Sequence, residues 1–179
     1  MIKVSIFAKP KTKGKGHYIV IPDNVRRDKS LTSNHKILYG EIAALCLNGG
    51  SCWPYAIYFA DALGVDSGTI TCWFKELAEK HYIVAGEVLT INRLIYTETP
   101  SYFLIIPPKV LGDKSLTSDQ KLLYGEISAL CIKGSPLFCD KQLCKRFAGA
   151  IGVNANSVKL WLKTLAQKGY IEAETVEAF

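Results

Sequence analysis

The side chains best suited to recognition chemistry lie between residues 141 and 163. Asn156, Lys159 and Lys163 follow one another at intervals of three and four residues, so a helix would present them on one face. Asparagine can form two hydrogen bonds with adenine, and lysine can reach guanine or a phosphate. Ser157 completes this set. A second basic group precedes it and could grip a flanking phosphate backbone: Lys141, Lys145 and Arg146.

A weaker version of the same surface occurs earlier in the chain. Its exposed residues are expected to be Ser67, Gly68, Thr69, Thr71 and Lys75. They are small and mostly uncharged, and residues 18–99 hold seven basic and nine acidic groups. This set could read bases weakly, follow the second set onto DNA, or face a protein partner. For both sets the alternative is a solvated helix face without a ligand.

A lysine-rich segment lies near the start of the chain. Lys9, Lys11, Lys13 and Lys15 separate residues 1–8, which alternate like a strand, from a second strand near Tyr18. Such a segment could form a hairpin tip that contacts phosphates or a minor groove. A solubilising loop is the alternative interpretation.

Composition favours a globular protein with an acidic partner. The chain has 179 residues, 49% of them hydrophobic and 21% charged. No apolar run approaches the ~20 residues of a membrane span, and the opening residues do not form a secretory signal. We therefore expect a soluble, cytoplasmic protein without a membrane partner. The net charge of +6 comes from the first 17 residues, with five lysines and no acid, and from residues 100–179, with ten basic and seven acidic groups.

Catalytic and metal-binding patterns are absent from the sequence. It contains no G-x-x-x-x-G-K-[ST], no G-x-S-x-G and no H-E-x-x-H. The three histidines are isolated and the six cysteines lack C-x-x-C spacing, so Cys46 and Cys131 are expected to be buried thiols. The sequence predicts a protein that is not an enzyme and that uses no metal or cofactor.

A long internal repeat organises the candidate residues. The sequence DKSLTSNHKILYGEIAALC at 28–46 returns as DKSLTSDQKLLYGEISALC at 113–131, an offset of 85 residues. Further along the offset is 88, because three residues are inserted in a loop, and Trp73 aligns with Trp161. Two copies are too few for a solenoid. They predict two self-contained modules, module 1 (residues 1–98) and module 2 (residues 99–179).

Each module is expected to begin with a strand and a helix. Residues 18–22 and 102–107 are β-rich and end in proline, which predicts short strands. Thr32 and Thr117 are the expected N-caps of the helices that follow, and Gln120 lies at capping-box spacing from Thr117.

A second and a third helix are expected to carry the recognition side chains. The second helices, about 55–63 and 140–151, end at Gly-Val before Asp66 or Asn154, which are the expected caps of the third helices. Because glycine tolerates positive φ, the third helix can leave the turn at a steep angle. Its apolar stripe includes Trp73 or Trp161, so we expect both tryptophans in the core rather than stacked on bases.

The order of elements is that of a winged helix. A β-hairpin is expected at 82–96, with its turn at Gly86-Glu87, whereas only eight residues follow Ile171 in module 2. The predicted fold class is α+β, with two tandem winged-helix domains of three helices and a small β-hairpin or sheet each. Module 1 would carry a basic N-terminal β-hairpin loop, and module 2 a short or truncated wing.

The two copies resemble a known family. The segments LTSNHKILYGEIAALC and LTSDQKLLYGEISALC, with GVDSGTITCWFKELAEKHYIV and GVNANSVKLWLKTLAQKGYI, are similar to the helix-turn-helix module of phage and plasmid replication initiators and replisome organisers. The resemblance covers nearly the whole chain apart from the lysine-rich segment. It implies a winged-helix fold, origin binding and contact with other replication proteins.

The sequence therefore predicts binding of double-stranded DNA through two winged-helix modules. Tethering two modules lengthens the site and lets modest affinities combine. Replication initiation is implied by the resemblance, with transcription regulation as the nearest variant. A protein–protein adaptor built on winged helices is the alternative from another class. The sequence leaves oligomerisation possible.

Overall fold

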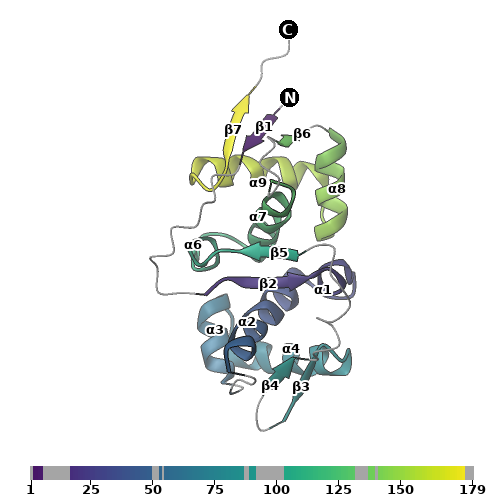
Figure 1. Ribbon diagram of the computed structural model, residues 1–179, viewed down its shortest axis with the longest axis vertical. Coiled ribbons are helices and arrows are strands. Elements are labelled where there is room, and N and C mark those ends of the chain that lie inside the picture. Colours follow the sequence, from purple (N-terminus) through teal and green to yellow (C-terminus); the bar gives the residue numbers. More distant parts are fainter. Residues whose placement is uncertain are drawn as a thin grey trace.

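Figure 1 shows a computed structural model, which describes residues 2–5, 17–49, 53, 55–86, 89–91, 103–131, 137–139 and 141–175. Module 1 contains, in chain order, β1 (Ile2–Ser5), β2 (Ile19–Pro22), α1 (Asp23–Arg27), α2 (Ser33–Gly49), α3 (Ala56–Leu63), α4 (Ser67–Glu79), β3 (Ile83–Ala85) and β4 (Leu89–Ile91). Module 2 contains β5 (Phe103–Ile106), α6 (Pro108–Leu111), α7 (Ser118–Cys131), β6 (Leu137–Cys139), α8 (Lys141–Ile151), α9 (Ala155–Gln167) and β7 (Glu172–Thr175).

The fold is α+β and mostly helical, as expected, and its element order is compatible with a winged helix. The short helices α1 and α6 and the strand β6 were not expected from the sequence. Buried apolar side chains from both modules form one continuous cluster. Within the described part of the chain, no helix has the length and apolarity needed to cross a bilayer.

Local capping explains where the principal helices begin. The Asp66 carboxylate accepts a hydrogen bond from the Thr69 amide at 2.9 Å and caps α4, and the Asn154 side chain accepts one from the Ser157 amide at 2.9 Å and caps α9. The capping box before α7 is confirmed, because the Thr117 amide donates to Gln120 Oε1 at 2.9 Å.

His35 takes the place of that glutamine before α2. Its ring contacts the Thr32 hydroxyl and, at 2.9 Å, Glu76 of α4. His35 therefore links α2 to α4, and the reciprocal capping box of α7 does not form at α2.

A sheet shared by the two modules lies at the centre of the molecule. Strand β2 pairs antiparallel with β5, with Val20 opposite Ile105 and Ile19 opposite Ile106 (Figure 1). Val20 and Ile105 are also equivalent in the repeat, at the offset of 85. A pseudo-twofold axis therefore passes through this residue pair and exchanges the modules. They share a sheet and a core, so the self-contained modules expected from the sequence are not what the described residues form.

Two equivalent glycines let a helix of each module lie close to this sheet. A Cβ atom at Gly40 of α2 would lie 3.0 Å from Ile19 Cδ1, and one at Gly125 of α7 would lie 3.3 Å from Ile106 Cγ1. Each glycine stands in the repeated Leu-Tyr-Gly-Glu-Ile segment. The need for close helix–strand packing explains why this position is glycine in both copies.

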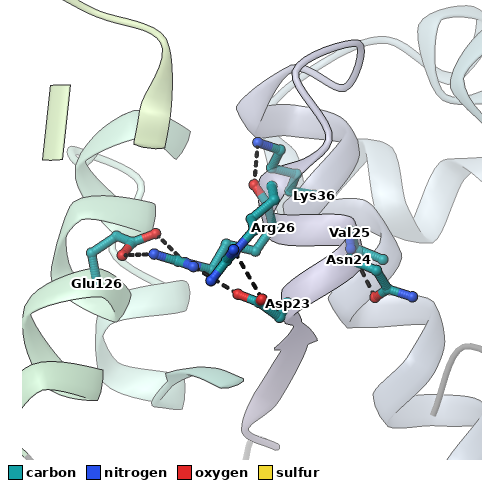
Figure 2. A network of polar contacts seen from close by, with 7 residues as sticks. Asp23, Asn24, Val25, Arg26, Lys36 and Glu126 are labelled. Carbon is teal, nitrogen blue, oxygen red and sulfur yellow. Dashed lines mark hydrogen bonds and ion pairs between the residues drawn. The ribbon is translucent and has the colours of Figure 1, made fainter. Parts of the chain in front are cut away.

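A buried ion pair also crosses between the modules (Figure 2). Arg26 of α1 donates to Glu126 of α7 through two bonds, Nε to Oε1 at 2.6 Å and Nη2 to Oε2 at 2.8 Å. Its Nη1 donates to Asp23 at 2.7 Å, and Lys36 Nζ donates to the Arg26 carbonyl at 2.7 Å. Burial opposes the charge on Arg26, but the Glu126 and Asp23 carboxylates together outweigh it and raise the arginine pKa.

The N-terminal strand pairs differently from the expectation. Strand β1 lies between β6 and β7 in a three-stranded antiparallel sheet of order β6-β1-β7. Since β2 belongs to another sheet, the predicted N-terminal hairpin between these two strands is wrong. Residues 6–16 lie outside the described residues. The hairpin predicted at 82–96 is confirmed for the strands that the structure describes, because β3 pairs with β4. Residues 87–88 and 92–96 lie outside the described residues.

Candidate nucleic-acid interface

Helix α9 has a buried apolar face and an exposed face that is mainly polar but includes Leu160, whose side chain is 63% exposed. Val158, Leu162 and Leu165 are buried, and Trp161 is half-buried against the core. Gly152 has φ of +88° and ends α8, which turns the chain into the Asn154 cap of α9. The opposite face of α9 exposes three predicted residues: Asn156, Lys159 and Lys163. Ser157 is half-buried beside the cap.

Helix α8 packs against α9 and adds a second basic row. Cys144, Phe147 and Ala148 face the core, and the predicted phosphate contacts are exposed: Lys141, Lys145 and Arg146. From residue 141 to residue 168 the chain has six basic residues and no acidic one. The two helices therefore present a cationic surface without an internal carboxylate to neutralise it.

Helix α4 carries the corresponding polar residues of module 1. Ser67, Thr71 and Lys75 are exposed and Thr69 is half-buried. Two of these side chains already bond within the helix, because the Thr69 hydroxyl donates to Asp66 and the Thr71 hydroxyl donates to the Ser67 carbonyl at 2.9 Å. Trp73 is half-buried against the core, which agrees with its predicted packing role.

The structure gathers the predicted residues into two separate heads. Helices α8 and α9 lie toward one end of the long axis of the molecule, and α3 and α4 lie toward the other (Figure 1). We call these pairs the α8–α9 head and the α3–α4 head. The remaining predicted contacts, Lys11, Lys13 and Lys15, lie outside the described residues.

The surface of α3 differs sharply from that of α8. At the offset of 88, Lys141, Lys145 and Arg146 correspond to Trp53, Ile57 and Tyr58. These three apolar side chains are 63%, 75% and 48% exposed. Residues 53–80 also contain four acidic and two basic groups. The α3–α4 head is thus apolar and acidic where the α8–α9 head is basic.

The repeated Asp-Lys-Ser segment proves to be a structural clamp. Asp28 accepts hydrogen bonds from the Ser30 amide at 2.7 Å and from the Tyr82 hydroxyl at 2.9 Å. Burial opposes ionisation of Asp28, but hydrogen bonds from the Ser30 hydroxyl, the Ser30 amide and Tyr82 outweigh it and lower the aspartate pKa. Burial and the same aspartate raise the pKa of Tyr82 to about 12.

The clamp is repeated in module 2, where the equivalent lysine contacts the aspartate directly. Asp113 accepts from the Ser115 amide and the Tyr170 hydroxyl, both at 2.9 Å, and from Lys168 Nζ at 3.1 Å. The Ser115 hydrogen bonds hold the pKa of Asp113 far below its usual range. Each clamp joins the loop before the first long helix to the segment that follows α4 or α9. This structural role was not predicted from the sequence. The signal for it was that Asp-x-Ser and Tyr-Ile both occur in each copy of the repeat.

The described residues contain no cluster of three or more potential metal ligands. Cys46 and Cys144 are buried and Cys131 is half-buried, whereas Cys72 is exposed. Searches for similar proteins found no matching family model, no matching curated protein and no matching solved structure.

Proposed function

We propose that the protein binds double-stranded DNA through the α8–α9 head. The observation that carries this proposal is that α8 and α9 together hold five basic residues and no acidic one, with Asn156 and Lys159 on the exposed face of α9. A major groove admits one α-helix, and residues in its N-terminal half reach base edges. Helix α9 would enter the groove, and the lysines and arginine of α8 would contact the phosphates beside it.

The pseudo-twofold relation supports an inverted arrangement for a longer proposed target. Two recognition helices related by a twofold axis meet DNA half-sites in inverted orientation, whereas helices related by translation meet direct repeats. The exposed residues of α4 and α9 differ, so the two halves would differ in sequence. The proposed target is an imperfect inverted repeat whose strong half binds α9.

The biological setting is proposed from the resemblance to replication initiators and replisome organisers. In that setting the protein binds an origin of a phage or plasmid in the cytoplasm and contacts replication proteins. Transcription regulation uses the same DNA chemistry and is the nearest variant. The two uses separate when the bound site is placed in a repressible promoter and, independently, in a plasmid that lacks another origin.

The α3–α4 head supports a second candidate function, that of a protein adaptor. Exposed Trp53, Ile57 and Tyr58 beside a net acidic surface would suit a protein partner with apolar side chains flanked by basic groups. DNA binding by one head and protein binding by the other are compatible. An adaptor alone would form no complex with DNA.

Gel-shift titration at two salt concentrations tests the proposal. We expect a saturable complex with duplex DNA whose affinity falls steeply as salt rises, because bound lysines release counterions. Selection from a random duplex library should then return an inverted motif with unlike halves. Absence of a saturable complex at low salt would refute DNA binding and leave the adaptor function.

A further inference from the structure

The hairpin after α4 provides a reference for the corresponding part of module 2. In that hairpin Ala85 of β3 lies opposite Leu89 of β4, and Val84 lies opposite Thr90. At the offset of 88, β7 takes the place of β3, with Ala173 at the position of Ala85 and Glu172 at that of Val84. The question is which strand takes the place of β4.

Strand β1 fills that place in the same register and the same direction. Val4 lies opposite Ala173 and Ser5 lies opposite Glu172, both in an antiparallel pairing. Val4 and Ser5 therefore occupy the positions that Leu89 and Thr90 occupy in module 1.

The sequence carries the same correspondence. Val-Ser-Ile at 4–6 and Leu-Thr-Ile at 89–91 each place a hydroxyl residue between two apolar residues. The two segments lie 85 residues apart. This is the offset that relates β2 to β5 and the first long helices to each other. The internal repeat therefore extends upstream of β2 to include the N-terminal strand.

We propose that β1 is the second wing strand of the α8–α9 head, supplied from the start of the chain. Strand β1 is the middle strand of its sheet, and Val4 pairs with Leu137 on one side and Ala173 on the other. Strand β7 follows α9 directly and contacts it. Residues 2–5 thus act as a positioning element that fixes the wing beside the recognition helix.

The consequence for binding rests on the proposed function. A wing strand more than a hundred residues away in sequence from α9 makes DNA affinity depend on the N-terminal residues, although none of them lies on α8 or α9. The helix-turn-helix sequence of module 2 would not be sufficient for full affinity.

Proline substitution in the full chain tests the assignment. Val4→Pro removes an amide from a central strand, where proline is not tolerated. Its matched control is Leu89→Pro at the equivalent position of the other wing. Hydrogen exchange followed by mass spectrometry should be about tenfold faster or more at 137–139 and 172–175 in Val4→Pro, and unchanged at 83–85. In Leu89→Pro, exchange should be faster at 83–85 and unchanged at 137–139 and 172–175.

DNA affinity should follow the same pattern, with Val4→Pro weakening binding about tenfold and Leu89→Pro by less. Val4→Gly, a milder change, should raise exchange at the same segments to an intermediate degree if Val4→Pro prevents folding. Unchanged exchange at 172–175 in both Val4 variants would overturn the strand assignment.

If Val4→Pro speeds hydrogen exchange at 172–175 but leaves DNA affinity unchanged, β1 is a wing strand that does not position the wing for binding. If the unaltered chain forms no complex with DNA, the proposed function fails while the exchange experiment still tests the wing. A dimer in native mass spectrometry that separates into monomers with Val4→Pro would show that a second copy supplies the strand, and would overturn pairing within one chain.

Discussion

The α3–α4 head and the α8–α9 head have the same backbone plan and opposite surfaces. Both recognition helices begin at a side-chain cap and bury an apolar stripe, and both end at an Asp–Tyr clamp. Yet residues 141–168 carry six basic groups and no acid, whereas residues 53–80 carry two basic and four acidic groups. The residues that form the caps and clamps are thus repeated in both copies, whereas the exposed residues differ between them.

We expect the largest effect on stability from removing the ion pair that links the two modules. Arg26→Ala leaves Glu126 buried without its cation, and we expect a loss of about 3 kcal/mol in the free energy of unfolding. The measurement is urea denaturation followed by circular dichroism. Arg27→Ala is the neighbouring control, since its side chain is 70% exposed and its pairing with Asp23 should contribute under about 1 kcal/mol. Equal losses in the two variants would contradict a buried link between the modules.

Exchanging exposed residues between the two heads tests whether these residues determine DNA affinity. Lys141→Trp, Lys145→Ile and Arg146→Tyr together place on α8 the side chains found at the equivalent positions of module 1, and we expect DNA affinity to fall about thirtyfold or more at low salt. The reciprocal pair Ile57→Lys and Tyr58→Arg should raise affinity by less than tenfold. Both affinities come from gel-shift titration of proteins whose thermal melting is unchanged. An unaltered affinity in the triple variant would remove α8 from the interface.

The recognition helices can be compared at matched positions. Lys159→Ala with Lys163→Ala should weaken DNA binding about tenfold and flatten the dependence on salt, because both lysines face the proposed groove. Lys75→Ala, equivalent to Lys163 in the repeat, should change affinity less than twofold. Similar losses from both heads would show that they contribute equally.

The two clamps should differ slightly in their response to acid. A carboxylate with a lowered pKa stabilises the folded state above the unfolded pKa of about 3.9, and this contribution is lost as pH falls below that value. Asp113→Asn should therefore lower Tm by a few degrees at pH 7 and flatten its fall below about pH 4. Asp28→Asn should do so less, because Lys80 bonds Ser30 whereas Lys168 contacts Asp113 directly. Melting curves across pH measure both effects, and a larger shift for Asp28→Asn would contradict this order.

Local features of the fold could be predicted from the sequence, and distant pairings could not. Asp66, Asn154 and the Thr117–Gln120 capping box act within four residues, so their spacing was sufficient to identify them. Strand partners are set by tertiary packing, and alternation in residues 1–8 identifies a strand without naming its neighbour. The prediction of an N-terminal hairpin was wrong for this reason, and the pairing of β2 with β5 was not foreseen.

The candidate site was predictable to the extent that it depends on helix periodicity. Burial of Val158 and Leu162 leaves Lys159 and Lys163 exposed, as the apolar stripe of α9 predicts. The contrast with α3 was missed, because the exposure of Trp53 and Ile57 depends on which faces the rest of the fold leaves uncovered. Aromatic and branched residues in a short helix otherwise favour a core position.

The pseudo-twofold axis through Val20 and Ile105 has an evolutionary consequence. In a homodimer every substitution appears twice, so neither subunit can change its surface without the other. Covalent joining of the two copies removes that constraint, because each position then exists once and drifts separately. A basic face on one copy and an aromatic, acidic face on the other is a difference that the identical subunits of a homodimer could not acquire.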